Sequence, residues 1–163
     1  RRRPGTIALA ACVALTVCLG TAQFARQRDD TFLAFRQAIV QASLDKADHT
    51  DVAGLDAVGY KRWIAAHHGD PDFILPSGLA KNNVAACRVL EWQARRVTML
   101  CFDLPGHHAD IFVVNEGDLP GVSLDHSPTF YADNGETSAA WKQGNKIYLV
   151  ATTLPISDLQ QLL

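Results

Sequence analysis

The sequence predicts an α+β domain that follows an N-terminal hydrophobic segment. Three observations support this prediction: an uncharged apolar run near the start of the chain, two stretches with apolar residues at helical spacing, and later short apolar stretches separated by turn residues. We expect an N-terminal transmembrane helix, two helices, an antiparallel β-meander of about five strands and a short C-terminal helix. The 163 residues suit one domain and a tether. We therefore assign residues 1–28 to a membrane anchor with its flanks and residues 29–163 to an exported domain.

The N-terminal hydrophobic run covers residues 6–22 and carries no charge. As a helix it is about 25 Å long, which is at the short end for crossing a bilayer. Three arginines precede it, and the positive-inside rule keeps such a terminus in the cytoplasm. A cleaved signal peptide is the alternative, because the small residues Gly20 and Ala22 suit a cleavage site. Under both interpretations the domain is extracytoplasmic. We expect a single pass through a bacterial inner membrane, with residues 29–163 in the periplasm.

Two helices are expected after the anchor. The first, capped by Asp29 or Asp30, runs to about Leu44, and the second runs from about Leu55 to His68. Apolar residues of the first helix fall on one stripe at helical spacing: Phe32, Phe35 and Ile39. The second helix carries four larger residues on one side: Tyr60, Trp63, Ile64 and His67.

The centre of the sheet is expected within residues 84–114. Three apolar stretches lie there, Val84–Trp92, Val97–Leu104 and Ile111–Val114. The middle stretch is apolar at both odd and even positions, as in a strand covered on both faces. Residues expected in the core share an apolar or aromatic side chain on a predicted strand: Trp92, Leu100, Phe102, Phe112, Trp141 and Tyr148.

The last third of the chain predicts a loop, a hairpin and a final helix. Residues 117–128 hold two prolines and two glycines and read as a surface loop, and residues 130–131 as a short edge strand. Gly144-Asn145 then predicts a two-residue turn that places Trp141 opposite Tyr148 and Ala140 opposite Leu149. Residues 157–160 resemble a capping box that opens a helix reaching the end of the sequence.

Two of the four cysteines, Cys87 and Cys101, lie on the two strands of a predicted hairpin. A three-residue loop over residues 93–95 would place them opposite each other, whereas a two-residue loop would place Cys87 opposite Leu100. An exported compartment permits a disulfide, and we favour this bridge as a structural staple. The other two, Cys12 and Cys18, lie in the hydrophobic run. No C-x-x-C, His-x-x-x-Cys or H-E-x-x-H spacing predicts a zinc site.

The charge distribution disfavours a nucleic-acid partner. The net charge is −2, but five arginines flank the hydrophobic run, and from Asp29 onward ten basic residues stand against seventeen acidic ones. Neutralisation of phosphates supplies most of the affinity of nucleic-acid binding. An acidic domain without a basic stripe is therefore expected to bind neither DNA nor RNA.

The sequence offers little to support catalysis. The pairs His67-His68 and His107-His108, the latter close to Asp110, are the strongest candidates for metal binding or acid–base chemistry. Adjacent histidines on a turn project apart, and no third ligand follows at a suitable spacing. Asp103 and Glu91 are isolated strand carboxylates, and neither a G-x-S-x-G elbow nor a phosphate-binding glycine loop is present. We expect no enzyme, no cofactor and no metal site.

Several strand motifs resemble a group of uncharacterised bacterial membrane-anchored proteins. In that group a Cys-Arg-x-x-x-Trp strand precedes a Cys-Phe strand and a Phe-Val-Val strand, as residues 87–92, 101–102 and 112–114 do here. The ending, residues 140–144 with Tyr148 and a Leu-rich helix, is similar to the extracytoplasmic part of transmembrane anti-sigma factors. The resemblance covers about residues 55–163. The cytoplasmic zinc-binding segment of that family is not in this chain, and we expect either that it precedes Arg1 or that the protein lacks it.

This resemblance implies a membrane-tethered regulatory or sensory protein whose exported domain binds a protein partner. Two alternatives stay open. One is an exported redox or ligand-binding protein that uses Cys87 and Cys101, and the other is a structural envelope protein without catalysis.

Overall fold

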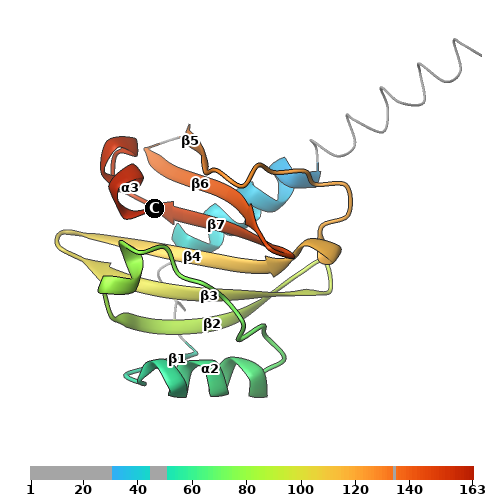
Figure 1. Cartoon of the computed structure of the whole chain (residues 1–163), viewed down its shortest axis with the longest axis vertical. Coiled ribbons are helices and arrows are strands. Elements are labelled where there is room, and N and C mark those ends of the chain that lie inside the picture. The colour runs from blue at the N-terminus through green and yellow to red at the C-terminus, as the bar shows by residue number, and fades with distance from the viewer. Residues whose placement is uncertain (1–30, 45–50, 134) are drawn as a thin grey trace, which may run out of the picture.

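The structure, a computed structural model, describes residues 31–44, 51–133 and 135–163. It is an α+β fold in which a seven-stranded antiparallel sheet has helices on both faces (Figure 1). The described helices are residues 31–44, α2 (Ala57–Ala66) and α3 (Ile156–Leu162). None of the described helices is long and apolar enough to cross a membrane. The anchor expected at residues 6–22 lies outside the described residues, as do Asp29 and Asp30, the expected caps of the first helix.

The order of the strands differs from the expected meander of about five strands. The sheet runs β1-β2-β3-β4-β7-β6-β5, so two three-stranded meanders join where β4 pairs with β7. Every residue of β7 is buried, and a strand of this kind needs a neighbour on each side. The segment after β4 therefore leads to the far edge of the sheet, and β6 and β7 return toward β4. The strands are β1 (Val52–Ala53), β2 (Val84–Trp92), β3 (Arg95–Leu104), β4 (His107–Asn115), β5 (Thr129–Asp133), β6 (Glu136–Gln143) and β7 (Lys146–Thr152).

The β6–β7 hairpin has the predicted register. Gly144 has a φ of 63°, which glycine adopts without strain, and the turn pairs Trp141 with Tyr148 and Ala140 with Leu149. The two aromatic rings stack with centroids 5.2 Å apart and an interplanar angle of 10°. The predicted edge strand is also confirmed, as β5, and the loop before it contains one 3₁₀ turn, η3 (Glu116–Asp118).

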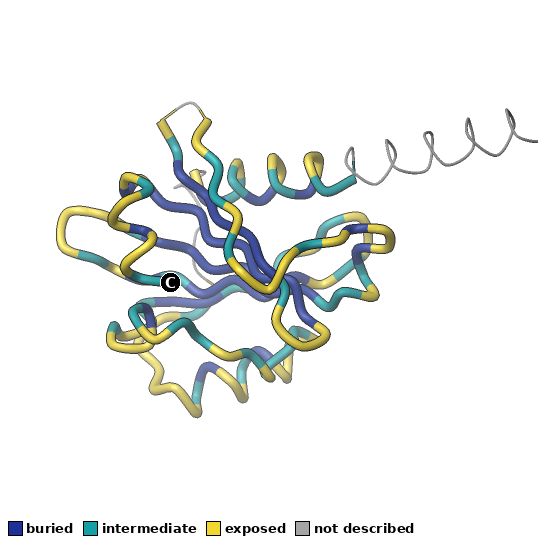
Figure 2. Tube along the Cα trace, turned by 45° about the horizontal axis from the view of Figure 1, so that its top comes forward, coloured by how far each residue is buried: buried dark blue, intermediate teal, exposed yellow. Residues whose placement is uncertain are grey.

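Alternate residues of the strands face two separate hydrophobic clusters, so the sheet is buried on both sides (Figure 2). We name the sides by their covers. Face A lies under α2, α3 and a strap formed by residues 69–79. Face B lies under the helix at residues 31–44 and the loop at residues 119–124. Four of the expected core residues are buried on face A: Leu100, Phe102, Trp141 and Tyr148. Phe112 is buried on face B, where the partly buried Trp92 also packs.

The strap over face A leads into η2 (Leu79–Lys81) and passes close to the sheet. At Gly69 an added Cβ would lie 2.7 Å from Val89 Cγ2 and 2.8 Å from Ile64 Cγ2. A side chain at this position would therefore push the strap away from both neighbours. In Figure 1 the strap crosses in front of the strands, and the helix at residues 31–44 lies behind them.

The helix ends differ from the predicted ones for local reasons. The second helix is α2, which is shorter than residues 55–68, because the side chain of Asp56 accepts a hydrogen bond from the Gly59 N–H (2.7 Å) and fixes the first turn. It ends before His68, whose φ is 61°. The predicted capping box of α3 is wrong: Pro155 is the N-cap, and the Ser157 hydroxyl donates to Asp158.

Candidate functional site

The expected disulfide between Cys87 and Cys101 is wrong, because both thiols are free. The β2–β3 turn has two residues, Gln93 and Ala94, so Cys87 pairs with Leu100. Cys87 consequently belongs to the face A cluster, and Cys101 packs against the face B cluster. Because side chains alternate along a strand, this register directs the two sulfurs to opposite sides of the sheet.

Both thiols have surroundings that keep them protonated. Burial, and secondarily the charge of Asp51, raises the pKa of Cys87 to about 12. Burial also raises the pKa of Cys101, and the carboxylate of Asp110, which accepts a hydrogen bond from this thiol, adds to the effect. Reactive cysteines need a lowered pKa and a positive environment. These two sites have the opposite character, which gives the redox alternative no support.

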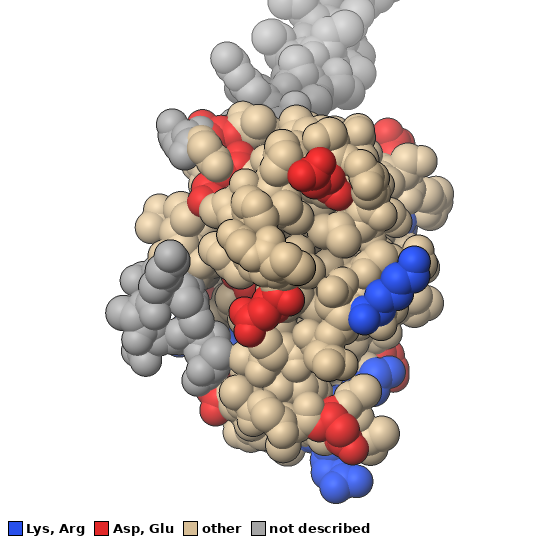
Figure 3. All heavy atoms as spheres, turned by 90° about the vertical axis from the view of Figure 1, so that its left-hand side faces the viewer, with Lys and Arg blue, Asp and Glu red and all other residues tan. Residues whose placement is uncertain are grey.

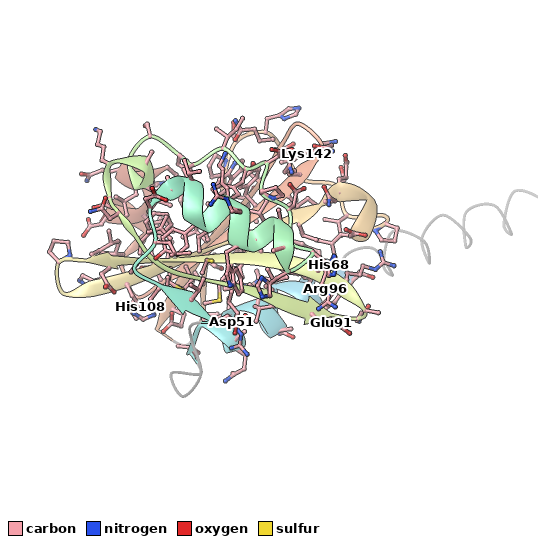
Figure 4. The ribbon with its side chains drawn as sticks, turned by 90° about the horizontal axis from the view of Figure 1, so that it is seen from below. Asp51, His68, Glu91, Arg96, His108 and Lys142 are labelled. Carbon is pink, nitrogen blue, oxygen red and sulfur yellow. The ribbon has the colours of Figure 1, made fainter. Side chains whose placement is uncertain are left out.

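The candidate acid–base residues do not converge. The ring of His67 stacks on Trp63 with centroids 3.8 Å apart. His108 lies at the opposite end of the sheet from His68, next to which Glu91 and Arg96 form an exposed ion pair of 3.1 Å (Figure 4). Within residues 31–44, 51–133 and 135–163, no group of three His, Cys, Asp or Glu residues could hold a metal ion.

Charges on the surface are scattered rather than clustered on the face seen in Figure 3. Single Lys, Arg, Asp and Glu side chains are separated there by broad uncharged areas. Several charged residues elsewhere are in ion pairs across neighbouring elements, such as Lys142 with Glu116 (2.6 Å) and Arg95 with Asp118 (3.8 Å).

The first concave feature is a groove of about 450 Å³ at the edge of face A. Four segments line it: residues 74–77 of the strap, the loop residues His126 and Pro128, the end of β6 with its turn (residues 141–144), and Leu163, which follows α3. Trp141 is only 5% exposed and contributes to the floor, whereas Ile74 on the rim is 62% exposed. The groove therefore combines an apolar floor with a large exposed apolar side chain.

Hydrogen bonds hold the walls of this groove in place. The Ile74 N–H donates to the Tyr148 hydroxyl (3.1 Å), beneath the stacked Trp141 ring. On the opposite wall the Lys142 N–H donates to the Asp125 carbonyl (2.9 Å), and the His126 ring lies 3.1 Å from the Lys142 carbonyl. The groove is thus built by segments that are remote in sequence, and no local motif predicted it. In the sequence, the apolar Ile74 in the proline-containing stretch that ends at Pro76 is the nearest indication of it.

The second concave feature is a pocket of about 190 Å³ on face B, between the helix at residues 31–44 and the β5–β6 end of the sheet. The helix contributes Arg36 and Gln41 among others, and the sheet contributes Asp133, Glu136 and Ser138. The Arg36 guanidinium lies 4.6 Å from the centroid of the Tyr131 ring.

A buried polar cluster fastens the same helix to the sheet. The Ser43 hydroxyl donates to the Asp110 carboxylate, which is 3% exposed, and Asp110 pairs across the strands with Cys101. In the sequence Asp110 stands close to His107-His108, but the structure buries it under the helix at residues 31–44. A carboxylate between Ala109 and Ile111 in an apolar strand was the signal that could have identified it as buried.

No protein-family model, curated protein or solved structure matches this chain. The resemblance to transmembrane anti-sigma factors therefore stays a prediction from the strand motifs.

Proposed function

We propose that the domain is the exported, protein-binding part of a membrane-tethered regulatory protein similar to anti-sigma factors. The observation that carries the proposal is the groove at the edge of face A with the exposed Ile74 on its rim. A large exposed apolar side chain next to a concave surface is typical of a site for another protein.

The proposed occupant is a segment of a partner protein that inserts an apolar side chain toward Trp141. Apolar groups of the strap and of Pro128 line the groove together with polar groups such as Gln143. Protein interfaces usually combine apolar contact area with polar groups that form hydrogen bonds. The aromatic stack of Trp141 on Tyr148 makes the floor rigid, which reduces the entropy lost on binding.

A binding role is favoured over turnover because the titratable groups beside the groove already have partners. Lys142 is paired with Glu116, and the ring of His126 is hydrogen-bonded to a backbone carbonyl. General acid–base catalysis needs a group positioned against the substrate with a suitable pKa. The groove offers apolar contact and hydrogen bonding instead.

The proposal also includes a link between the binding domain and the predicted membrane anchor. The helix at residues 31–44 covers face B and follows the predicted anchor at residues 6–22 in the sequence. A change of the sheet on partner binding would reach the anchor through this helix. We place the N-terminus in the cytoplasm and residues 29–163 in the periplasm, so an alkaline phosphatase fused after Leu163 is expected to be active. Activity of a cytoplasmic reporter at the same position would contradict this topology.

Photo-crosslinking in the native cells tests the groove. A photoreactive amino acid replaces Ile74 in one strain and Val58, on α2, in a second; these two apolar residues are 62% and 63% exposed. We expect a crosslinked protein of one defined mass from position 74 and none from position 58. The Trp141→Ala substitution should abolish the product. Equal products from both positions, or a product that survives the Trp141 substitution, would contradict the proposal.

A further inference from the structure

We propose that two copies of this chain associate through the open edge of β5 and thereby join their sheets into one. The sheet ends at β5, which pairs with β6 on one side and has no neighbour among the described strands on the other (Figure 1). A strand at the end of a sheet presents unpaired N–H and C=O groups to any chain that adds a further strand. This inference goes beyond the proposed function and does not rest on the binding groove.

The register of the β5–β6 hairpin shows which backbone groups are open. Asp133 pairs with Glu136 across a two-residue turn, and such a closing pair is joined by hydrogen bonds. Residues alternate along an antiparallel ladder, so Tyr131 also bonds to β6, whereas Phe130 and Ala132 direct their N–H and C=O groups to the open side. In the described part of the chain, no backbone–backbone hydrogen bond outside the helices and strand ladders involves these two residues.

β5 lacks the features that usually prevent an edge strand from pairing with another chain. Its five residues, Thr129–Asp133, include no proline and no lysine, and its register with β6 contains no bulge. Proline, lysine and bulges are the usual protection of a sheet edge. Phe130 and Tyr131 are aromatic residues, which favour strands. The edge is therefore suited to receive another strand.

A second copy of β5 fits this edge with two-fold symmetry. In an antiparallel arrangement centred on Tyr131, Phe130 of each copy lies opposite Ala132 of the other, and both pairs exchange N–H and C=O bonds. All the outward backbone groups of these two residues thus find partners. Tyr131 faces the partner's Tyr131 across the two-fold axis, and aromatic pairs across strands stabilise a sheet.

Charges also match in this arrangement. The Arg36 guanidinium lies over the Tyr131 ring, 4.6 Å from its centroid, and none of the ion pairs among the described residues includes it. Thr129 lies opposite the partner's Asp133, so this carboxylate is a diagonal neighbour of Tyr131 on the same face of the sheet. Each Arg36 therefore gains an acidic group from the other copy.

The arrangement suits two chains anchored in one membrane. The two-fold axis between antiparallel strands of one sheet is perpendicular to the sheet, so both copies have face B on the same side. The helix at residues 31–44 covers face B and follows the predicted anchor at residues 6–22 in the sequence. Both copies of this helix consequently lie on one side of the joined sheet, as two anchors in the same bilayer require.

Disulfide crosslinking in membranes that carry the full 163-residue chain tests the arrangement. Every variant also contains Cys12→Ser and Cys18→Ser, which remove the cysteines of the hydrophobic run. In Tyr131→Cys the introduced thiols occupy a non-hydrogen-bonded pair with Cα atoms about 4.5 Å apart, within the range for a disulfide. We expect copper phenanthroline to produce a dimer that a reductant reverses. Asp133→Cys is the matched control and should stay monomeric, because its two copies are offset by roughly 13 Å along the strands.

Two further variants test the pairing itself. Ala132→Pro removes an N–H that faces the open side, which an edge strand tolerates. It should lower the crosslinked fraction of Tyr131→Cys by about tenfold or more, since the hydrogen bonds that Ala132 donates in both copies are lost. Thr129→Cys and Asp133→Cys, produced together, should crosslink to each other although neither dimerises alone. This last pair keeps Tyr131 and Ala132, so it decides the register even where a substitution at either residue disturbs the strand.

Three results would overturn the inference. The first is the absence of a dimer from both Tyr131→Cys and the co-produced pair. The second is a Tyr131→Cys dimer that survives Ala132→Pro, or an equal dimer from Asp133→Cys alone, because either would mean a contact other than strand pairing at this register. The third is a disulfide to a different protein, seen as a product of another mass, which would assign the edge to that protein.

Discussion

The two faces of the sheet are covered in different ways. The cover of face A is held by polar contacts at several points along the strap: the partly buried Asp70 forms an ion pair with Lys146 and exchanges hydrogen bonds with Thr98, and Ile74 donates to Tyr148. The helix over face B rests mainly on the apolar side chains of Phe35 and Ile39. At its end, the buried hydrogen bond from Ser43 to Asp110 fastens it to the sheet.

This difference between the two covers matches the two roles that we propose for them, binding on face A and coupling to the anchor on face B. The strap of face A is part of the proposed binding groove, so its polar contacts keep the groove in one shape. The helix of face B follows the predicted anchor in the sequence, and an apolar docking surface fastened by the Ser43–Asp110 hydrogen bond near the helix end suits an element that moves relative to the sheet. In Figure 4 α2 and this helix lie on opposite sides of the strands, so a signal would have to cross the sheet.

The largest expected effect tests whether the helix belongs to the folded core. Phe35 is fully buried, and Phe35→Ala should lower the free energy of unfolding by about 3–5 kcal/mol through loss of burial and creation of a cavity. Urea unfolding followed by tryptophan fluorescence measures this change. Leu33→Ala on the same helix is the control, because Leu33 is 44% exposed and should change stability much less. A small effect of both substitutions would mean that the helix is only loosely docked.

A smaller effect is expected where the helix is fastened. Ser43→Ala removes the donor to the buried Asp110 carboxylate and should cost about 1–3 kcal/mol, since one acceptor is left unpaired. Ser157→Ala changes an exposed serine in the same way and should be nearly neutral. Hydrogen exchange should show faster exchange over residues 40–44 in the Ser43 variant. Faster exchange in the strap instead would contradict the separation of the two faces.

On face A, Tyr148→Phe removes the hydroxyl that accepts from Ile74. Because the stacked ring stays, we expect a loss of only about 0.5–1.5 kcal/mol. The informative measurement is the exchange rate of the Ile74 amide, which should rise while the amides of residues 36–44 keep their rates. Equal acceleration on both faces would mean that the two covers open as one unit.

The smallest expected effect on the free energy of unfolding at neutral pH comes from the buried thiols. This effect increases as the pH rises. Burial raises the pKa of Cys87 to about 12 in the folded state, above the value of about 8.5 for an unfolded thiol. The neutral thiol thus contributes stability that is fully present below about pH 8.5 and is lost as the pH rises toward about 12. In a Cys12→Ser, Cys18→Ser background, Ellman's reagent at about pH 8 should modify Cys87 and Cys101 slowly in the folded chain and rapidly after unfolding. Rapid modification of the folded chain would contradict the buried, protonated state.

Local sequence patterns predicted the parts of the fold that depend on neighbouring residues. The Gly144-Asn145 turn fixes the β6–β7 register because the turn geometry sets the pairing of the flanking residues. The hairpin at Gln93-Ala94 shows the limit of this reasoning. Both residues adopt a positive φ without being glycine, so the sequence did not distinguish a two-residue turn from a three-residue turn. The expected disulfide depended on the length of this turn, because only a three-residue turn would place Cys87 opposite Cys101.

The strand order and both concave sites depend on contacts between remote segments. No residue pattern near β7 indicates that β4 is its neighbour in the sheet. The groove needs Ile74 and Trp141, which come close to each other only after the sheet forms. The pocket on face B likewise joins Arg36 to Glu136 across a hundred residues of chain. Patterns of short range predict elements, whereas sites built from distant elements become visible only in three dimensions.

The central claim is that the domain regulates a process inside the cell through the helix that joins it to the anchor. A flexible glycine-serine spacer inserted between Arg28 and Asp29, which lie outside the described residues, tests it most directly. The transcripts of the spacer strain are compared with those of the unaltered strain and of a strain that lacks the gene. The same spacer at Gly106, in the open β3–β4 turn where the structure leaves free space, is the control. We predict that the Arg28–Asp29 spacer reproduces the transcript changes of the deletion, while the Gly106 spacer does not. If the Arg28–Asp29 spacer strain matches the unaltered strain, although its domain is folded and crosslinks its partner from position 74, coupling through the helix is wrong.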